Sequence, residues 1–388
     1  MSILLFRKTL AQRIAALFSG GKQGAWYEPS FATGYQDSAG TTAQTAVEQP
    51  TGKRLDKSGN SNHASQATAG SRPTLSARVN LLTKSDDLSN AAIWPRYGGA
   101  TVTGTNTINL PTAGTDGVSQ STGAIVGVAY TASVVLSGSG TTTLVPANYG
   151  ADQTITLTAT PTRYYFSGVA TNVIIGTYIF RRPGNTATVV EATDFQVESG
   201  STSTRYQRVN TATDYDTAGF PLYDKFDGTD DSLTSATGGG ASAGFFLCQA
   251  IKPTGGAGAV RTIWSDVGTN TGYKVQLDAA NKLSFSAGNA TAYTTKASTA
   301  TVDVGTTSLI TVWDDGTNLN VQIGSAAAET VARPVVSAGT AGFTVGKDNG
   351  AATSFFTGNL YPEVYRQTSL SAGERATVQA YCRSKAGL

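Results

Sequence analysis

Residues 308–324 read SLITVWDDGTNLNVQIG, and this stretch decides the fold class. After Asp315, Gly316 and Thr317, polar and apolar residues alternate in NLNVQI, which is the period of a half-buried strand, and the SLITVWD before the turn is a short run rich in β-branched and aromatic residues. Asp-Gly is a strong hairpin turn signal because both residues tolerate a positive φ. The stretch therefore predicts two antiparallel strands joined by a tight turn. Similar short strands, with turns every 8–12 residues, recur from about 78 to 212 and from about 213 onward.

The composition agrees with an all-β protein and excludes several chemistries. Charged residues make up 14% and hydrophobic residues 39%, with 44 glycines among 388 residues, so apolar surface is available to bury and turns are frequent. One histidine, His63, and two cysteines, Cys248 and Cys382, cannot build a multi-histidine or multi-thiolate metal centre. A net charge of +2 gives no strong field for nucleic acid, and no run of about 18 apolar residues predicts a membrane span.

The two ends of the chain are predicted to be helical. Near the N-terminus, apolar residues recur at spacings of three and four and give an amphipathic helix of about four to five turns within residues 1–19; they are Ile3, Phe6, Leu10, Ile14 and Leu17. We expect this stripe to dock on another protein or on sister chains, and the alternative is packing on its own domain. Arg7, Lys8 and Arg13 follow the apolar start, so we do not interpret it as a secretory signal. At the C-terminus, Ser371 and Glu374 form a capping box that opens a short helix.

The C-terminal half resembles the concanavalin A-like (laminin-G-like) sandwich family. The residues that carry the resemblance are FDGTDDSLTSA (226–236), GFFLCQAIKP (244–253), the hairpin above, and the closing FTVGKDNG…FFTGNLYPEVYRQTSLSAGERATVQAYCRSK. This resemblance implies a β-sandwich and is poor evidence for function, since the fold hosts many functions.

Two further segments resemble modules of bacteriophage virion proteins. One is similar to a jelly-roll, carbohydrate-binding-module-like domain; it opens with NLLTKSDDLSNAAIWPR and closes with ATDFQVESGSTSTRYQRVN. The other is similar to the leader of tail and virion-surface proteins, and it runs from GAWYEPS to SRPTL. In that family the leader runs almost directly into the FDGxDDxL strand. We therefore expect a sandwich made of residues 20–77 and 213–388, interrupted by an inserted jelly roll at 78–212, because insertion is tolerated where the ends of a surface loop lie close together.

Catalytic residues are not apparent in the sequence. Glucanases of the concanavalin-like fold need paired carboxylates, in patterns such as Glu-x-Asp-x-Glu or Glu-x-x-Glu, and none of the seven glutamates falls in such a pattern. No Gly-x-Ser-x-Gly elbow is present, and His63 lies in a polar NSNHAS stretch that is typical of a loop. We expect no enzyme activity.

Two sets of residues are candidates for binding. Aromatic rings can stack on sugar rings, and the candidates in the middle module are Trp94, Tyr97, Tyr149 and Tyr165, each of which could instead be a packing residue. Asp227, Asp230 and Asp231 place three carboxylates within five residues, where they could bind Ca²⁺ or simply form a turn before the next strand. No other cofactor is expected.

The resemblance implies a non-enzymatic structural and adhesive protein of a tailed-bacteriophage particle: a tail fibre, spike or head fibre located in the virion and docked on other virion proteins through its N-terminal helix. The resemblance implies attachment to a host-surface glycan by rigid sandwiches, in a homo-oligomer for which a trimer is the family habit. Two alternatives remain open. One is a capsid decoration or tail-architecture protein that binds only virion partners, and the other is a polysaccharide depolymerase.

Overall fold

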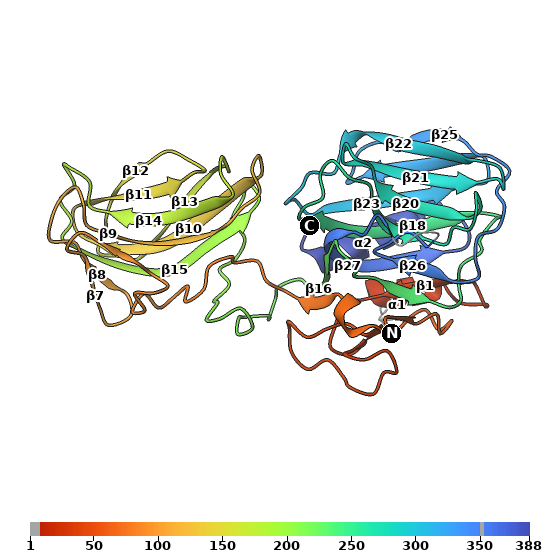
Figure 1. Ribbon diagram of the computed structural model, residues 1–388, viewed down its shortest axis with the longest axis horizontal. Coiled ribbons are helices and arrows are strands. Elements are labelled where there is room, and N and C mark those ends of the chain that lie inside the picture. The colour runs from red at the N-terminus through yellow and green to blue at the C-terminus, as the bar shows by residue number, and fades with distance from the viewer. Residues whose placement is uncertain (1–7, 350–352) are drawn as a thin grey trace, which may run out of the picture. The chain divides into compact units, whose positions relative to one another are not determined.

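The computed structural model describes residues 8–349 and 353–388, and it is all-β with two short helices, as the sequence predicts (Figure 1). The described chain divides into two compact units. Unit 1 comprises the described residues up to Ala77 and from Pro221 onward, and unit 2 comprises Arg78–Phe220. Neither described helix has the length and hydropathy needed to cross a membrane.

Unit 1 contains two antiparallel sheets that pack face to face. In the first sheet the strand order is β25 (Glu329–Ala332), β24 (Asn318–Ile323), β23 (Ser308–Asp314), β18 (Phe245–Pro253), β27 (Thr357–Arg366), β16 (Tyr223–Asp227) and β5 (Thr74–Ser76), and β1 (Gly24–Tyr27) also pairs with β27. In the second sheet the order is β2 (Gly34–Tyr35), β3 (Lys53–Arg54), β4 (Ala64–Ser65), β17 (Leu233–Ser235), β26 (Phe343–Val345), β19 (Arg261–Ser265), β20 (Tyr273–Leu277), β21 (Lys282–Gly288) and β22 (Tyr293–Thr301). A single 3₁₀ turn, η1 (Ala69–Ser71), precedes β5.

The hairpin predicted from residues 308–324 is confirmed. Strands β23 and β24 pair antiparallel with Asp314 opposite Leu319, and Gly316 adopts a φ of +88° in the turn between them. Apolar residues of this hairpin, including Ile310, Val312 and Leu319, point into the core between the two sheets. Aromatic rings fill the centre of this core, where Trp264 and Tyr365 approach to 4.7 Å between ring centroids.

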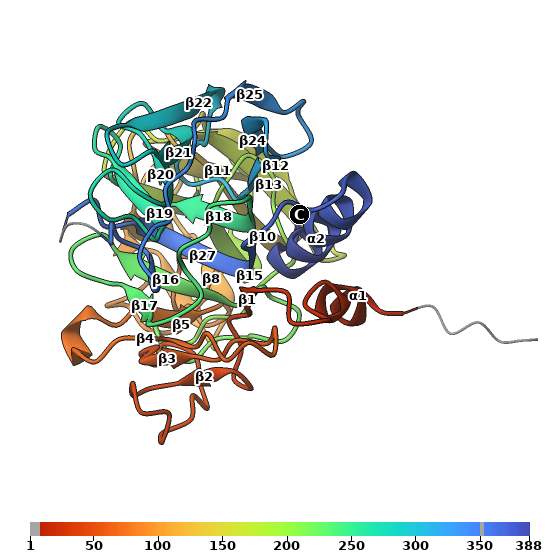
Figure 2. The ribbon, with the colours of Figure 1, turned by 90° about the vertical axis from the view of Figure 1, so that its right-hand side faces the viewer.

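The two helices cover the outer face of the first sheet of unit 1 (Figure 2). Helix α2 (Ala372–Ala386) begins at the predicted capping box, in which Ser371 and Glu374 exchange hydrogen bonds. Helix α1 (Leu10–Ala16) begins at Thr9, whose side chain accepts a hydrogen bond from the backbone of Gln12.

In the residues that the structure describes, the N-terminal apolar stripe packs on its own domain, which is the alternative left open above, and the expected docking of Ile14 and Leu17 on other proteins or sister chains is wrong. The helix starts at Leu10, and Ile14 and Leu17 are buried in the same apolar layer as Trp26, Tyr381 and Cys382, with Leu10 packed at its edge. The reason is that the outer face of the first sheet is itself apolar, so the stripe is buried within its own unit. Ile3 and Phe6 lie outside the described residues.

Unit 2 is a separate sandwich of two five-stranded sheets. One sheet has the order β13 (Thr162–Val169), β10 (Ala129–Gly138), β15 (Val189–Ser199), β8 (Thr107–Asn109) and β7 (Thr101–Thr103). The other has the order β12 (Gln153–Thr156), β11 (Thr141–Ala147), β14 (Ile174–Phe180), β9 (Gly117–Gly123) and β6 (Arg96–Tyr97).

Unit 2 extends beyond the boundary expected at residue 212. Tyr215 forms a β-bridge with Val209, and the Arg205 guanidinium lies 4.9 Å from the Phe220 ring centroid, so residues 213–220 pack with unit 2. On the side of unit 1, Ser76 pairs directly with Tyr223 between β5 and β16. The two ends of the inserted segment are thus neighbours in one antiparallel pair.

Replacing Ile14 by Ala is expected to destabilise unit 1 by about 2–5 kcal/mol, the usual loss for a buried Ile-to-Ala change. Urea unfolding of the full chain, followed by tryptophan fluorescence, measures the loss, because three of the four tryptophans lie in unit 1. The matched control is Ala15→Ser on the exposed face of α1. Equal stability of the two variants would contradict the packing of α1 described above.

Replacing residues 78–221 by Asn-Gly is expected to leave unit 1 folded, because the two-residue turn would join β5 and β16 in their existing register. The measurement is cooperative thermal unfolding of the shortened chain by circular dichroism. A shortened chain that lacks a cooperative transition would show that unit 1 depends on unit 2 for folding.

Candidate ligand-binding sites

Two of the four predicted sugar-binding aromatics are core residues, so the prediction is wrong for them. Trp94 is 0% exposed, and its indole nitrogen donates to the carbonyl of Lys84 at 2.9 Å. Tyr149 is 2% exposed, and its hydroxyl lies 2.9 Å from that of Thr177. Both rings fill the interior of unit 2, where packing uses the same aromatic area that a sugar would need.

The other two aromatics, Tyr97 and Tyr165, are exposed by 39% and 56%. Tyr165 lies on β13 with the Arg163 guanidinium 6.0 Å from its ring centroid. Tyr97 lies on β6, in the other sheet of unit 2, and has two further rings beside it. Its centroid is 5.4 Å from that of Phe180 and 6.1 Å from that of Tyr178.

Tyr97, Tyr178 and Phe180 form a surface that we call the aromatic platform. Tyr178 and Phe180 are half-buried and stack at 5.5 Å with 15° between their planes, on the face of β14 opposite to the buried Ile179. Two glycines let these rings lie close to the sheet: a Cβ atom on Gly176 would come within 2.4 Å of the Tyr178 ring, and one on Gly117 within 2.2 Å of the Phe180 ring. Rings over strand glycines also stabilise a sheet, so the platform has a structural role as well.

The sequence analysis missed Tyr178 and Phe180, although a signal was present. The two rings stand two residues apart on one predicted strand, and alternate residues of a strand point to the same face. Alternation with Ile175 and Ile179 indicates which of the two faces is buried. What the sequence could not supply is the neighbouring position of Tyr97, which comes from the pairing of both β6 and β14 with β9.

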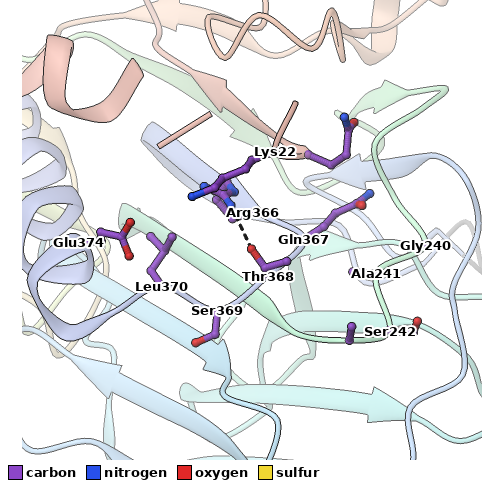
Figure 3. Close-up of a pocket in the computed structure, with 12 residues that line it drawn as sticks. Lys22, Gly240, Ala241, Ser242, Arg366, Gln367, Thr368, Ser369, Leu370 and Glu374 are labelled. Carbon is purple, nitrogen blue, oxygen red and sulfur yellow. Dashed lines mark hydrogen bonds between the residues drawn. The ribbon is translucent and has the colours of Figure 1, made fainter. Parts of the chain in front are cut away.

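Unit 1 contains a polar cleft of about 450 Å³ beside the start of α2 (Figure 3). This volume lies within the roughly 300–1,000 Å³ of small-molecule sites. Four separate segments of the chain line the cleft: Lys22 and Gln23, residues 240–243, residues 366–370, and Glu374. Most of the lining residues carry hydroxyl, amide or charged side chains, and apolar atoms make up more of the exposed lining than polar atoms do.

Arg366, at the end of β27, is the buried cation of this cleft. The side chain is 2% exposed; its guanidinium donates to the backbone carbonyl of Leu17 and, at 3.0 Å, to the hydroxyl of Thr368. The Phe18 ring centroid lies 5.4 Å from the guanidinium carbon. Among the described residues, Nε has no hydrogen-bond partner and no carboxylate forms an ion pair with Arg366. Burial lowers the pKa of this guanidinium, yet an arginine remains protonated in proteins.

Glu374 is the carboxylate that lines the same cleft, and it is engaged in capping α2. Its Oε2 accepts from the backbone nitrogen of Ser371 at 2.9 Å and from the hydroxyl at 2.7 Å. The Ser371 hydrogen bonds lower the pKa of this carboxyl, so it is ionised at neutral pH.

The acidic cluster predicted as a calcium candidate is assembled, with one oxygen of each carboxylate within 4.8 Å of the others. Each carboxylate also makes local hydrogen bonds. Asp227 accepts from the backbone of Thr229, Asp231 accepts from the backbone of Asp227, and Asp230 accepts from the hydroxyl of Ser71. Burial, followed by the charges of the two neighbouring aspartates, raises the pKa of Asp231 to about 6. The hydrogen bonds fit the turn interpretation, and calcium binding stays an untested prediction.

Two carboxyl groups of unit 1 with strongly shifted pKa values lie in the core. Burial raises the pKa of Glu363 to about 8 and that of Asp266 to about 7. Asp266 accepts backbone hydrogen bonds from Gly240 and Tyr273. His63 likewise serves the local structure, since its Nδ1 accepts from the backbone nitrogen of Asp56 at 3.0 Å.

Glu363 is directly opposite Gln249 in the pairing of β27 with β18. Both carboxyl oxygens of Glu363 and the amide oxygen of Gln249 lack a hydrogen-bond partner among the described residues. They line a cavity of about 20 Å³, which is room for about one water molecule. A neutral carboxyl group can donate a hydrogen bond here, whereas a carboxylate would be a buried, uncompensated charge.

No protein-family model and no curated protein sequence matches the chain. Several solved structures match in part. The CBM40 of the Ruminococcus gnavus IT-sialidase bound to α2,3-sialyllactose is 14% identical with a TM-score of 0.31, over 36% of this chain and 83% of that chain. The receptor-binding domain of botulinum neurotoxin type G is 14% identical with a TM-score of 0.33, over 43% of each chain.

A third match is domain 4 of AbnA, a GH43 extracellular arabinanase from Geobacillus stearothermophilus, in complex with arabinotriose. It is 14% identical with a TM-score of 0.33, over 41% of this chain and 76% of that chain. All three matches cover less than half of the chain described here, and the ligands named with them belong to those domains.

Replacing Glu363 by Gln is expected to remove a pH-dependent loss of stability. The folded-state pKa of about 8 lies above the value of about 4.3 expected in the unfolded chain, so the folded state holds a proton that the unfolded state releases. The stabilising contribution of Glu363 is complete below about pH 4 and is lost as the pH rises to about 8. At pH 8 the free energy of unfolding of the wild type should therefore be lower than that of the variant, by an amount on the order of a few kcal/mol.

Urea unfolding at pH 5 and pH 8 measures this difference, and Asp266 titrates in both proteins, so it cancels in the comparison. A variant that loses as much stability as the wild type between these pH values would show that Glu363 is ionised in the folded state throughout.

Proposed function

We propose that this chain is a non-enzymatic structural and adhesive component of a bacteriophage particle, a tail fibre, spike or head fibre, that attaches to a glycan on the host surface. The resemblance of the leader and of the FDGTDDSLTSA strand to virion proteins supports the location. The two rigid β-sandwich units support the adhesive role, since rigid scaffolds present binding surfaces with little loss of conformational entropy.

The observation that carries the glycan proposal is the aromatic platform of unit 2. The C–H groups on one face of a sugar ring pack on aromatic rings, and adjacent rings can support successive sugars of a chain. Tyr97, Tyr178 and Phe180 offer three rings with successive centroids 5.4–5.5 Å apart. The Arg182 guanidinium lies over the Phe180 ring, 5.0 Å from its centroid, and pairs with Asp152 at 3.1 Å; its remaining N–H groups can donate to sugar hydroxyls.

Attachment to the particle uses surfaces other than Ile14 and Leu17, because these side chains are buried in unit 1. Several copies on one particle would raise the overall affinity, since each additional contact becomes intramolecular once the first has formed. A homo-oligomer is the arrangement that this proposal favours.

The test is binding of the full chain to a glycan array and to cells of the host, with Tyr178→Leu and Phe180→Leu as the platform variants. Each variant keeps an apolar side chain over its glycine and removes the ring, so we expect binding to weaken by about tenfold or more with the fold intact. Tyr165→Leu, on the other sheet, is the matched control and should bind as the wild type does.

The location is tested in parallel by mass spectrometry of purified particles, in which we expect this chain. A chain that is present in particles but binds neither glycans nor host cells would favour the capsid decoration or tail-architecture alternative. Release of reducing ends from a host polysaccharide would favour the depolymerase alternative and contradict the proposal.

A further inference from the structure

The polar cleft of unit 1 is separate from the aromatic platform, and its charges point to a different kind of ligand. We propose that this cleft binds an acidic saccharide, with the anionic group of the sugar placed between Lys22 and Arg366. The site goes beyond the proposed function, because it lies in the other unit and uses charge where the platform uses ring stacking.

Arg366 is a buried cation that forms no ion pair among the described residues, and Glu374 is the carboxylate whose charge acts on it from a longer distance. A buried cation is costly unless an anion compensates it, and most buried charges in proteins are paired. Arg366 is held by a backbone carbonyl and a hydroxyl, and within the described part of the chain no carboxylate lies within ion-pair distance. Its Nε donor is also unpartnered there. A ligand anion in the cleft would supply the missing negative charge.

Lys22 is a second cation of the cleft. Lys22 and Arg366 both line it, and the charges of both act on the Glu374 carboxylate (Figure 3). Lys22 is exposed, whereas Arg366 is buried against the Phe18 ring and held by its hydrogen bonds to Leu17 and Thr368. One exposed and one buried cation face a single carboxylate, that of Glu374, so the cleft carries a net charge of +1.

The neutral polar side chains of the cleft favour a sugar over a simple inorganic anion. Thr368, Ser369 and Ser242 bring hydroxyl groups to the cleft, and Gln23 brings an amide. Hydroxyl and amide groups both donate and accept hydrogen bonds, as the hydroxyl groups of a sugar require. A volume of about 450 Å³ also exceeds what a phosphate or sulfate ion alone would fill.

Two further cations, Lys8 and Arg13, lie beyond the cleft, beside the first turn of α2. A second hollow of about 470 Å³ shares Glu374 with the cleft and is lined by Lys8, Arg13 and the start of α2. The N-terminal end of a helix adds a partial positive charge, so an anionic chain longer than one sugar would meet favourable potential on both sides of Glu374. The structure thus favours an oligosaccharide with repeated acidic groups.

The experiment is isothermal titration of the full chain with trigalacturonate and with its methyl ester, which has the same sugar backbone without the negative charges. We expect trigalacturonate to bind and the methyl ester to bind at least about tenfold more weakly. Binding should weaken further as the salt concentration rises, because the interaction is between charges.

Two variants change the charge of the cleft in opposite directions. Lys22→Gln removes a cation and should weaken binding of trigalacturonate by about tenfold, the loss expected for one charge-assisted hydrogen bond. Glu374→Gln removes the anion and keeps the capping box, which accepts Gln as well as Glu, so binding should tighten by about threefold. Lys225→Gln, an exposed lysine on β16 outside both hollows, is the matched control and should have no effect.

The outcomes separate this inference from the proposed function. Equal binding of the acid and the ester, or an affinity unchanged in Lys22→Gln and Glu374→Gln, would overturn the acidic-saccharide site while leaving the platform untouched. Binding of inorganic phosphate or a DNA oligonucleotide with the same dependence on Lys22, and no binding of trigalacturonate, would also overturn it. Loss of trigalacturonate binding in Phe180→Leu would move the site to unit 2 and contradict the inference.

Discussion

Strand β27 must bury both of its faces at once, and the rest of unit 1 depends on this constraint. Tyr365 points into the core between the two sheets, and Val364 points into the layer beneath helices α1 and α2. Because side chains alternate along a strand, a slip of one residue would exchange the two sets. A register shift opposite Gln249–Ile251 keeps Leu360 on the core face and Tyr361 on the helix face, although each lies an odd number of residues before Tyr365 and Val364 on the same faces. The same alternation places Glu363 in the core and brings Arg366 to the cleft.

The layer of helices links this strand to the candidate site. Leu17, at the end of α1, is buried in the same apolar layer as α2, and its backbone carbonyl accepts a hydrogen bond from the Arg366 guanidinium. The N-terminal segment therefore has two roles: it buries apolar surface of the first sheet, and it holds the Arg366 side chain in place. A cation fixed in this way binds an anion with little further loss of side-chain entropy, which is the physical basis of a preorganised site. The aromatic platform follows the same principle, since two glycines let its rings lie close over the sheet.

Features that depend on a few neighbouring residues could be predicted from the sequence. The β23–β24 hairpin follows from local alternation and an Asp-Gly turn, and the start of α2 follows from the spacing of Ser371 and Glu374. Features that depend on packing could not. Trp94 and Tyr97 are three residues apart, yet one is buried and the other exposed, because only the first points into the sandwich. The cleft joins residues from position 22 to position 374, and no spacing in the sequence brings these segments together.

The central claim is that a fixed cation at the end of β27 prepares unit 1 for an acidic sugar. The most direct measurement is a titration of the isotopically labelled full chain with trigalacturonate, followed by backbone amide chemical shifts. The account predicts that shifts change first at Lys22 and Gln23 and along residues 366–370, which line the cleft. Changes confined to the strands of unit 2, or spread evenly over exposed lysines, would contradict it.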